Sequence, residues 1–120
     1  MKILSPRVHG YLDYLVVVVF LLAPTLFRLE GAPCKISYAL AGIHLVLTLV
    51  TAFPLGLVKV IPFTVHGALE LVVSIALVAL PWLLGFAGNA PARNFYVAAG
   101  VVIFLVWLVT DYKGAAAGTS

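Results

Sequence analysis

The sequence is poor in charged residues and in cysteine. Only 9% of its 120 residues are charged, and a single cysteine, Cys34, excludes a disulfide framework. The seven basic residues are scattered singly along the chain, so there is no basic patch of the kind that binds nucleic acid. No glycine-rich phosphate loop, cysteine pair or nucleophile with an adjacent base is present, which makes an enzyme the class with the least support.

What the chain does have is long apolar runs. Hydrophobic residues make up 64% of it, and the mean hydropathy is +1.20. Because a bilayer core takes about 20 residues per helix, four spans use about 80 residues and leave no room for a soluble domain. The sequence therefore predicts an all-α membrane protein with a single transmembrane domain over 1–120 and a flexible tail at 113–120. The four predicted spans are Val8–Leu26, Ser37–Val58, Pro62–Gly85 and Arg93–Tyr112.

The orientation follows from the loops, since lysine and arginine are enriched on the cytoplasmic side. An even number of spans places both termini on one side of the membrane. Counting Lys and Arg gives a small excess on that side, so we expect cytoplasmic termini in a prokaryotic inner membrane. Pro54 and Gly56 lie near the end of the second span, where we expect its helix to kink or unwind.

The chain resembles itself at an offset of 57 residues. The segment 8–13, Val-His-Gly-Tyr-Leu-Asp, recurs at 65–70 as Val-His-Gly-Ala-Leu-Glu, and Pro24 recurs as Pro81. Thr51-Ala52-Phe53 is echoed more faintly by Thr110-Asp111-Tyr112. This pattern predicts two tandem helical hairpins, about 6–58 and 62–112. Two spans per hairpin give both copies the same orientation, as in parallel-repeat membrane proteins.

The second hairpin also carries a family motif. Residues 80–86, Leu-Pro-Trp-Leu-Leu-Gly-Phe, with Gly100 in the following helix, resemble the SPW repeat, a two-helix membrane hairpin named for Ser-Pro-Trp. The resemblance covers roughly 69–108. Leu80 replaces the serine, and the first copy, Ala23-Pro24-Thr25, matches only the proline. The family implies a small bacterial or archaeal integral membrane protein and supplies no catalytic residues.

Ionisable residues gather at one end of the predicted bundle. His9 and Asp13 are four residues apart on the first span, and His66 and Glu70 repeat this spacing on the third. Residues four apart share a helix face, and the repeat places the two histidines at equal depth. Asp111 ends the last span on the same side. Placing an ionisable residue inside a bilayer costs from about 2.5 kcal/mol of free energy upward, so we expect each such residue to have an interaction partner or a functional role.

Three interpretations of this layer stay open. First, His9 and His66 could ligate a haem-type cofactor, with Gly10 and Gly67 leaving space for a flat ring, or join Asp13 and Glu70 around one divalent metal ion. Second, the pairs could titrate along a proton or ion path in an oligomeric transporter or channel. Third, the polar groups could only tie helices together in a structural or assembly subunit. We favour metal or cofactor binding.

Two further expectations concern the rest of the bundle. His44 lies about seven residues from the opposite end of the second predicted span. This separates it by roughly 18 Å from the layer, so it cannot join the layer within one subunit. We favour a hydrogen bond from His44 to a threonine or a backbone carbonyl of a neighbouring helix, and the alternative is a relay with Thr48 and Asp111. Small residues at 39–42 and 98–100 let helices approach closely. Because four helices leave little interior space, we expect a homo-oligomer, with a dimer favoured, in the lipid bilayer.

Overall fold

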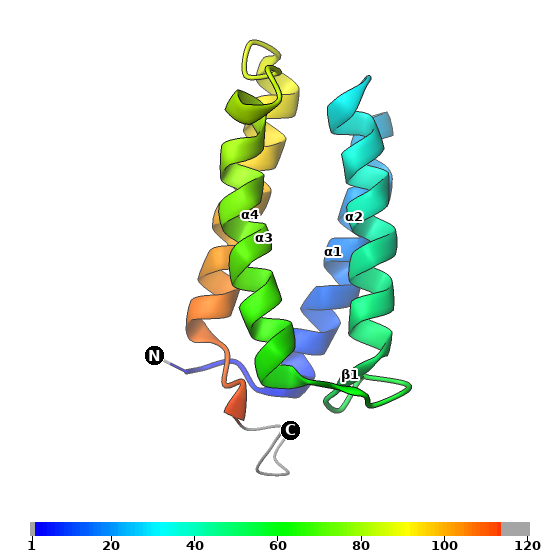
Figure 1. Ribbon diagram of the computed structural model, residues 1–120, viewed down its shortest axis with the longest axis vertical. Helices are drawn as coiled ribbons and strands as arrows, with labels where there is room; N and C mark the ends of the chain where they lie inside the picture. The colour runs from blue at the N-terminus through cyan, green and yellow to red at the C-terminus, as the bar shows by residue number, and fades with distance from the viewer. Residues whose placement is uncertain (1, 114–120) are drawn as a thin grey trace.

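A computed structural model describes residues 2–113, so most of the predicted tail 113–120 lies outside the described residues. Within that range the chain forms four long helices, arranged as two antiparallel pairs (Figure 1). The α1 and α2 helices make one pair, and α3 and α4 make the other. Their bounds are α1 Pro6–Leu26, α2 Ala32–Leu49, α3 Phe63–Leu83 and α4 Ala90–Val109.

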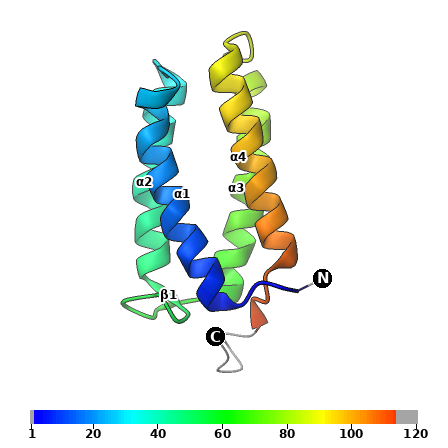
Figure 2. The same cartoon turned by 180° about the vertical axis from the view of Figure 1, so that it is seen from behind.

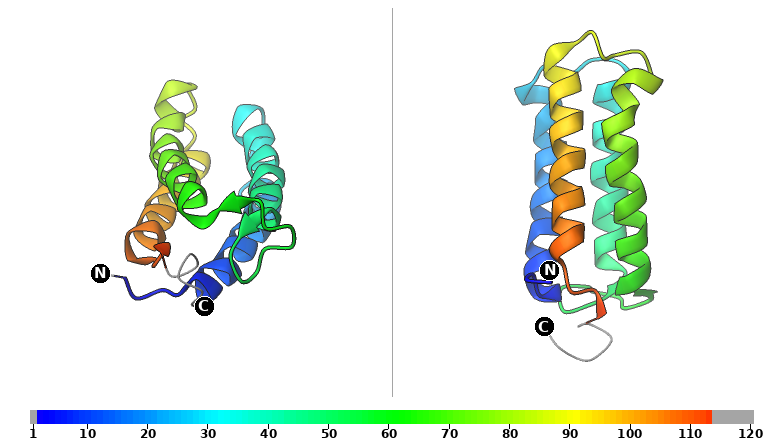
Figure 3. Two further views of the ribbon diagram at one scale, coloured as in Figure 1. Left: turned by 60° about the horizontal axis from the view of Figure 1, so that its bottom comes forward. Right: turned by 90° about the vertical axis from the view of Figure 1, so that its left-hand side faces the viewer.

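The two pairs meet at one end of the bundle and diverge toward the other (Figures 1 and 2). The start of α1 and the end of α4 lie where the pairs meet, and the two short hairpin loops lie at the opposite end (Figure 3). We call the first of these the termini end. There the Leu4 amide donates to the Val109 carbonyl, and the Asp111 amide donates to the Leu4 carbonyl, which joins the N-terminal segment to the end of α4.

Local sequence explains where the helices start and stop. Ser5 and Asn89 cap α1 and α4 by accepting hydrogen bonds from the backbone amides of Val8 and Ala92. After α1 and after α3 the chain turns through a glycine with positive φ, Gly31 at 62° and Gly85 at 78°, a conformation that glycine adopts without steric cost.

The second helix differs from the prediction. It runs Ala32–Leu49, five residues earlier at its start and nine earlier at its end than the predicted span. The chain beyond it forms two short parallel strands, β1 Thr51–Ala52 and β2 Ile61–Pro62, with a loop between them. The Lys59 ammonium closes this loop by donating to the carbonyls of Phe53 and Gly56. The loop contains apolar residues, so the hydrophobic stretch of the sequence continues past the end of the helix. This is why the predicted span was too long at its end.

All four helices are long and apolar enough to cross a membrane. At 1.5 Å per residue, α1 and α3 are each about 31 Å long, close to the roughly 30 Å of a hydrocarbon core. Large apolar side chains remain exposed on the outside, including Val72 at 64% and Leu83 at 73%. Inside, most of the buried polar residues lie near the termini end, while Phe20, Leu77 and Tyr96, together with the buried Ser37 and Ser74, lie in the rest of the core.

Candidate functional site

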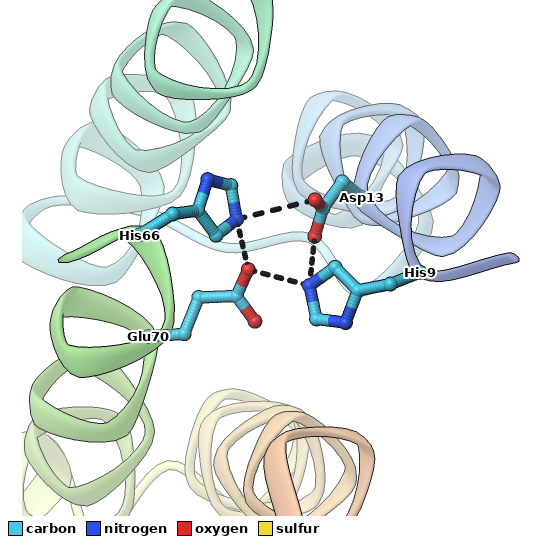
Figure 4. A group of neighbouring side chains, drawn as sticks. All are labelled: His9, Asp13, His66 and Glu70. Carbon is cyan, nitrogen blue, oxygen red and sulfur yellow. Dashed lines mark hydrogen bonds and ion pairs between the residues drawn. The ribbon is translucent and has the colours of Figure 1, made fainter. Parts of the chain in front are cut away.

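Four ionisable side chains converge between the two helix pairs. His9 and Asp13 come from α1, and His66 and Glu70 come from α3 (Figure 4). The histidines are fully buried, and Asp13 and Glu70 are only 3% and 4% exposed. One nitrogen or oxygen atom from each residue lies within 4.8 Å of the others. The structure thus brings together the four residues that the sequence singled out. We call them the His/acid cluster.

The cluster forms a closed ring in which imidazoles and carboxylates alternate (Figure 4). His9 Nε2 lies 2.8 Å from Glu70 Oε1 and 3.1 Å from Asp13 Oδ1. His66 Nε2 lies 3.2 Å from Asp13 Oδ2 and also contacts Glu70 Oε1. Both histidines therefore direct the same ring nitrogen, Nε2, at the same two carboxylates.

The other ring nitrogen of each histidine is held by a threonine of the opposite helix pair. His9 Nδ1 lies 2.9 Å from Thr110 Oγ1, and His66 Nδ1 lies 2.8 Å from Thr51 Oγ1. Each hydroxyl donates its own hydrogen to a backbone carbonyl four residues earlier, so its oxygen accepts from the imidazole N–H. With Nδ1 donating to the threonine, the hydrogen bond between Nε2 and a carboxylate oxygen requires a proton on Nε2 as well. A metal ion that replaced the Nε2 proton would meet a neutral imidazole whose remaining proton is held on Nδ1.

His44 also reaches the cluster, so the prediction that it lies about 18 Å away was wrong. Its Nε2 is 3.2 Å from Asp13 Oδ1, and its ring centroid is 6.0 Å from that of His66. The error came from the end of the second span. Because α2 stops at Leu49, His44 lies only about 7 Å from the termini end of its helix, and Asp13 is about 10 Å into α1.

Three buried oxygens in this region make no hydrogen bond with the described residues: Thr48 Oγ1, the Tyr112 hydroxyl, and Asp13 Oδ2, whose 3.2 Å ion-pair contact with His66 Nε2 is not a hydrogen bond. Buried carboxylate oxygens are nearly always satisfied, so Asp13 Oδ2 has capacity for a further partner. Of the predicted relay residues, Thr48 is fully buried one turn after His44. Asp111 is partly buried beyond the end of α4 and is not among the clustered ligand atoms.

Aromatic rings separate the cluster from the termini end. Phe53, Phe63 and Tyr112, which we call the aromatic cap, come from the loop after α2, the start of α3 and the segment after α4. Phe63 lies 5.3 Å from the His9 ring and 5.6 Å from the His66 ring, centroid to centroid, and 4.7 Å from the Tyr112 ring. The cap therefore covers the side of the cluster that faces the termini end.

The space beside Gly10 and Gly67 is occupied, contrary to the expectation that it would admit a flat ring. A Cβ on Gly10 would lie 2.7 Å from the Leu55 side chain, and one on Gly67 would lie 2.8 Å from the Tyr112 ring. The glycines serve close packing of the segments that follow α2 and α4. Tyr112 packs so closely that burial, together with the nearby carboxylates of Glu70 and Asp13, raises the pKa of its phenol.

The sequence did not identify the threonines as histidine partners. Thr51 and Thr110 were noted only as matching positions of the repeat, and contacts between hairpins leave no signal in the spacing of one chain. Comparison with protein-family models, with curated proteins and with solved structures found no match. The resemblance to the SPW repeat therefore stays a prediction.

Proposed function

We propose that this chain is an integral membrane protein that binds one divalent transition-metal ion through His9, Asp13, His66 and Glu70. The observation that carries the proposal is the matched orientation of the two histidines. Thr110 and Thr51 engage both Nδ1 atoms, so both Nε2 atoms point at one volume that carboxylate oxygens also face, and a metal ion there would replace the Nε2 protons. Metal-binding histidines typically donate their second ring nitrogen to an oriented acceptor in this way.

Charge and donor chemistry support the same proposal. Once a metal ion replaces the Nε2 protons, two carboxylates and two neutral imidazoles carry a charge of about −2, which the divalent cation neutralises inside a low-dielectric bundle. Imidazole suits zinc, iron, copper and nickel, and carboxylate suits harder ions, so the mixed set favours a first-row transition metal such as Zn²⁺ or Fe²⁺. Asp13 Oδ2, which has only an ion-pair contact with His66 Nε2 at 3.2 Å and no hydrogen bond with the described residues, would gain a ligand bond.

A single ion fits this site better than a haem. Both Nε2 atoms contact the same oxygen, Glu70 Oε1, so a carboxylate already lies where a porphyrin between two axial histidines would have to be. Ligand atoms within 4.8 Å of one another approach the separation of about 4 Å that bonds of roughly 2.1 Å allow across one ion. We therefore choose the divalent ion over the haem-type cofactor.

The bilayer setting is part of the proposal. The four apolar helices support four membrane spans, and the pairing of α1 with α2 and α3 with α4 supports two tandem hairpins. The histidine of each helix pair contacts a threonine of the other pair. A duplicated hairpin would produce this symmetric arrangement. We assign the termini to the cytoplasmic side and retain a homodimer as a prediction. The metal site itself is complete within one chain.

Metal analysis of the purified protein tests the proposal. The detergent-solubilised protein is stripped with a chelator, reloaded separately with Zn²⁺, Fe²⁺ and Mn²⁺, and analysed for bound metal. We expect about one ion per chain and a loss of roughly tenfold or more in affinity for His9→Gln and for His66→Gln, since each removes a ligand. Glu30→Gln is the matched control, because Glu30 is exposed in the α1–α2 turn.

Other outcomes would contradict the proposal in distinct ways. A wild-type protein that binds no ion while His9→Gln unfolds the bundle would support a structural cluster. A metal-free protein that conducts protons in liposomes, and loses this flux with Asp13→Asn, would support transport. Helix content measured by circular dichroism on every variant separates lost binding from lost folding.

A further inference from the structure

The His/acid cluster opens away from the termini end, toward the middle of the bundle. A cavity beside it is lined by Asp13, His44 and Glu70, with apolar neighbours including Leu12, Val102 and Val106. A second cavity, between α2 and α3, shares His44 and Glu70. The aromatic cap lies on the other side. Access to the cluster therefore runs between the two helix pairs, through apolar surroundings.

An apolar groove continues from this cavity. It lies between α1 and α4, is lined only by apolar side chains, and shares Leu12, Val102 and Val106 with the cavity at the cluster. From Val106 to Phe95 its α4 side covers about 16 Å at 1.5 Å per residue. That length is close to half of a hydrocarbon core of about 30 Å, the depth of one leaflet.

The cavity at the cluster and the α1–α4 groove together form a path with a polar end and an apolar end, as a membrane amphiphile has. Its polar end lies at the cluster, about 10 Å into α1 from the termini end, and its apolar run extends past the middle of the helices to Phe20 of α1 and Phe95 of α4. A single-chain amphiphile in a leaflet has the same order, with its head group near the surface and its tail toward the bilayer centre. Water-soluble molecules would meet the aromatic cap on one side and lipid-facing leucine and valine side chains on the other.

His44 supplies a polar group for the head of such a molecule. It contacts Asp13 through Nε2, which leaves Nδ1 without a hydrogen bond to any described residue, and its side chain is 13% exposed. With one divalent ion bound, the cluster has no net positive charge to pair with an anionic head group buried in apolar surroundings, so a neutral hydroxyl or carbonyl oxygen fits better. His44 can donate to or accept from such an oxygen, depending on its tautomer.

We propose that the site takes a neutral single-chain amphiphile, whose terminal hydroxyl or carbonyl oxygen meets His44 beside the metal and whose tail lies in the α1–α4 groove. This inference deepens the proposed function and rests on it for the metal, but the groove and His44 can be tested separately. The ligand would enter from the membrane and bind on the side of the cluster that faces the α1–α4 groove.

Photolabelling tests the inference. Metal-loaded protein in phosphatidylcholine liposomes is exposed to hexadecanol that carries a diazirine on its tail, irradiated, and mapped by mass spectrometry. We expect saturable labelling within 95–106 of α4 and 12–20 of α1. Unlabelled hexadecanol should compete, whereas hexadecane, which lacks the oxygen, and palmitate, which is anionic, should not. His44→Ala should weaken the labelling affinity by roughly tenfold, as expected for loss of one buried hydrogen-bond partner.

Two tryptophan variants provide a matched pair. Val102 lines both the groove and the cavity at the cluster, whereas its neighbour Val101 lines a separate hollow between α3 and α4, and the two side chains are 55% and 46% exposed. Val102→Trp should abolish the labelling, and Val101→Trp should leave it unchanged. Both should retain bound metal.

The outcomes separate this inference from the proposed function. Labelling that does not saturate, or that hexadecane blocks as well as hexadecanol does, would overturn the inference even if the metal is bound. A crosslinked dimer that buries the α1–α4 groove would also overturn it. Saturable labelling that depends on His44 in a protein without metal would support the amphiphile site and contradict the metal site.

Discussion

Replacing Thr51 by valine should weaken metal binding without removing any ligand. The Thr51 hydroxyl is fully buried and accepts from His66 Nδ1 at 2.8 Å. With metal on Nε2, the proton must stay on Nδ1, and a buried donor without an acceptor costs about 1–3 kcal/mol. Without metal, the His66 imidazole can carry its proton on Nε2, where Asp13 and Glu70 accept it. Loss of the Thr51 acceptor therefore destabilises mainly the metal-bound form of the protein. We expect an affinity loss of roughly 10- to 100-fold.

The assay is a Zn²⁺ titration in detergent against a chromogenic chelator of known affinity. Thr48→Val is the control, because Thr48 lies three residues earlier at the end of α2 and is equally buried, but its hydroxyl makes no hydrogen bond with the described residues. It should leave the affinity unchanged. Thr110→Val should repeat the effect of Thr51→Val, since Thr110 holds His9 in the same way. Equal affinities for Thr51→Val and Thr48→Val would refute the reasoning.

Three further predictions concern other parts of the site. Glu70→Gln should abolish stoichiometric metal binding, because Glu70 Oε1 contacts both histidines; retention of one ion per chain, measured by elemental analysis, would contradict this. Gly67→Ala should lower the thermal unfolding midpoint, since its Cβ would meet the Tyr112 ring at 2.8 Å and overpacking costs about 1–3 kcal/mol, whereas Gly42→Ala, with no atom within 4 Å, should not. Burial raises the pKa of Tyr112, so the folded state holds the phenol proton more tightly than the unfolded chain does. Stability should therefore be intact below about pH 10 and fall above it, and Tyr112→Phe should reduce that fall in thermal unfolding measured across this range.

The helices were largely predictable from the sequence because the apolar runs match the helix lengths. The α1 and α3 helices begin within two residues of the predicted starts, and the helix–turn–helix order of each pair follows from the turns near Gly31 and Gly85. The end of α2 was not predictable from hydropathy. Leu57 and Val58 are as apolar as helix residues, and only Pro54 and Gly56 signalled that the helix had ended.

The four members of the His/acid cluster were predictable because each pair shares a helix face and the repeat sets equal depth. The contact of His44 with Asp13 was not, since it depends on where α2 stops. The threonine contacts join residues 101 and 15 positions apart in the chain. Local spacing carries no information about such contacts, which follow from how the two helix pairs pack.

X-ray absorption on protein loaded with one equivalent of Zn²⁺ tests the central claim most directly. The account predicts a spectrum with only nitrogen and oxygen ligands at about 2.0–2.2 Å and the multiple scattering of two imidazoles, reduced to one imidazole in His66→Gln. A spectrum of hydrated zinc without imidazole scattering, or one that His66→Gln leaves unchanged, would contradict it.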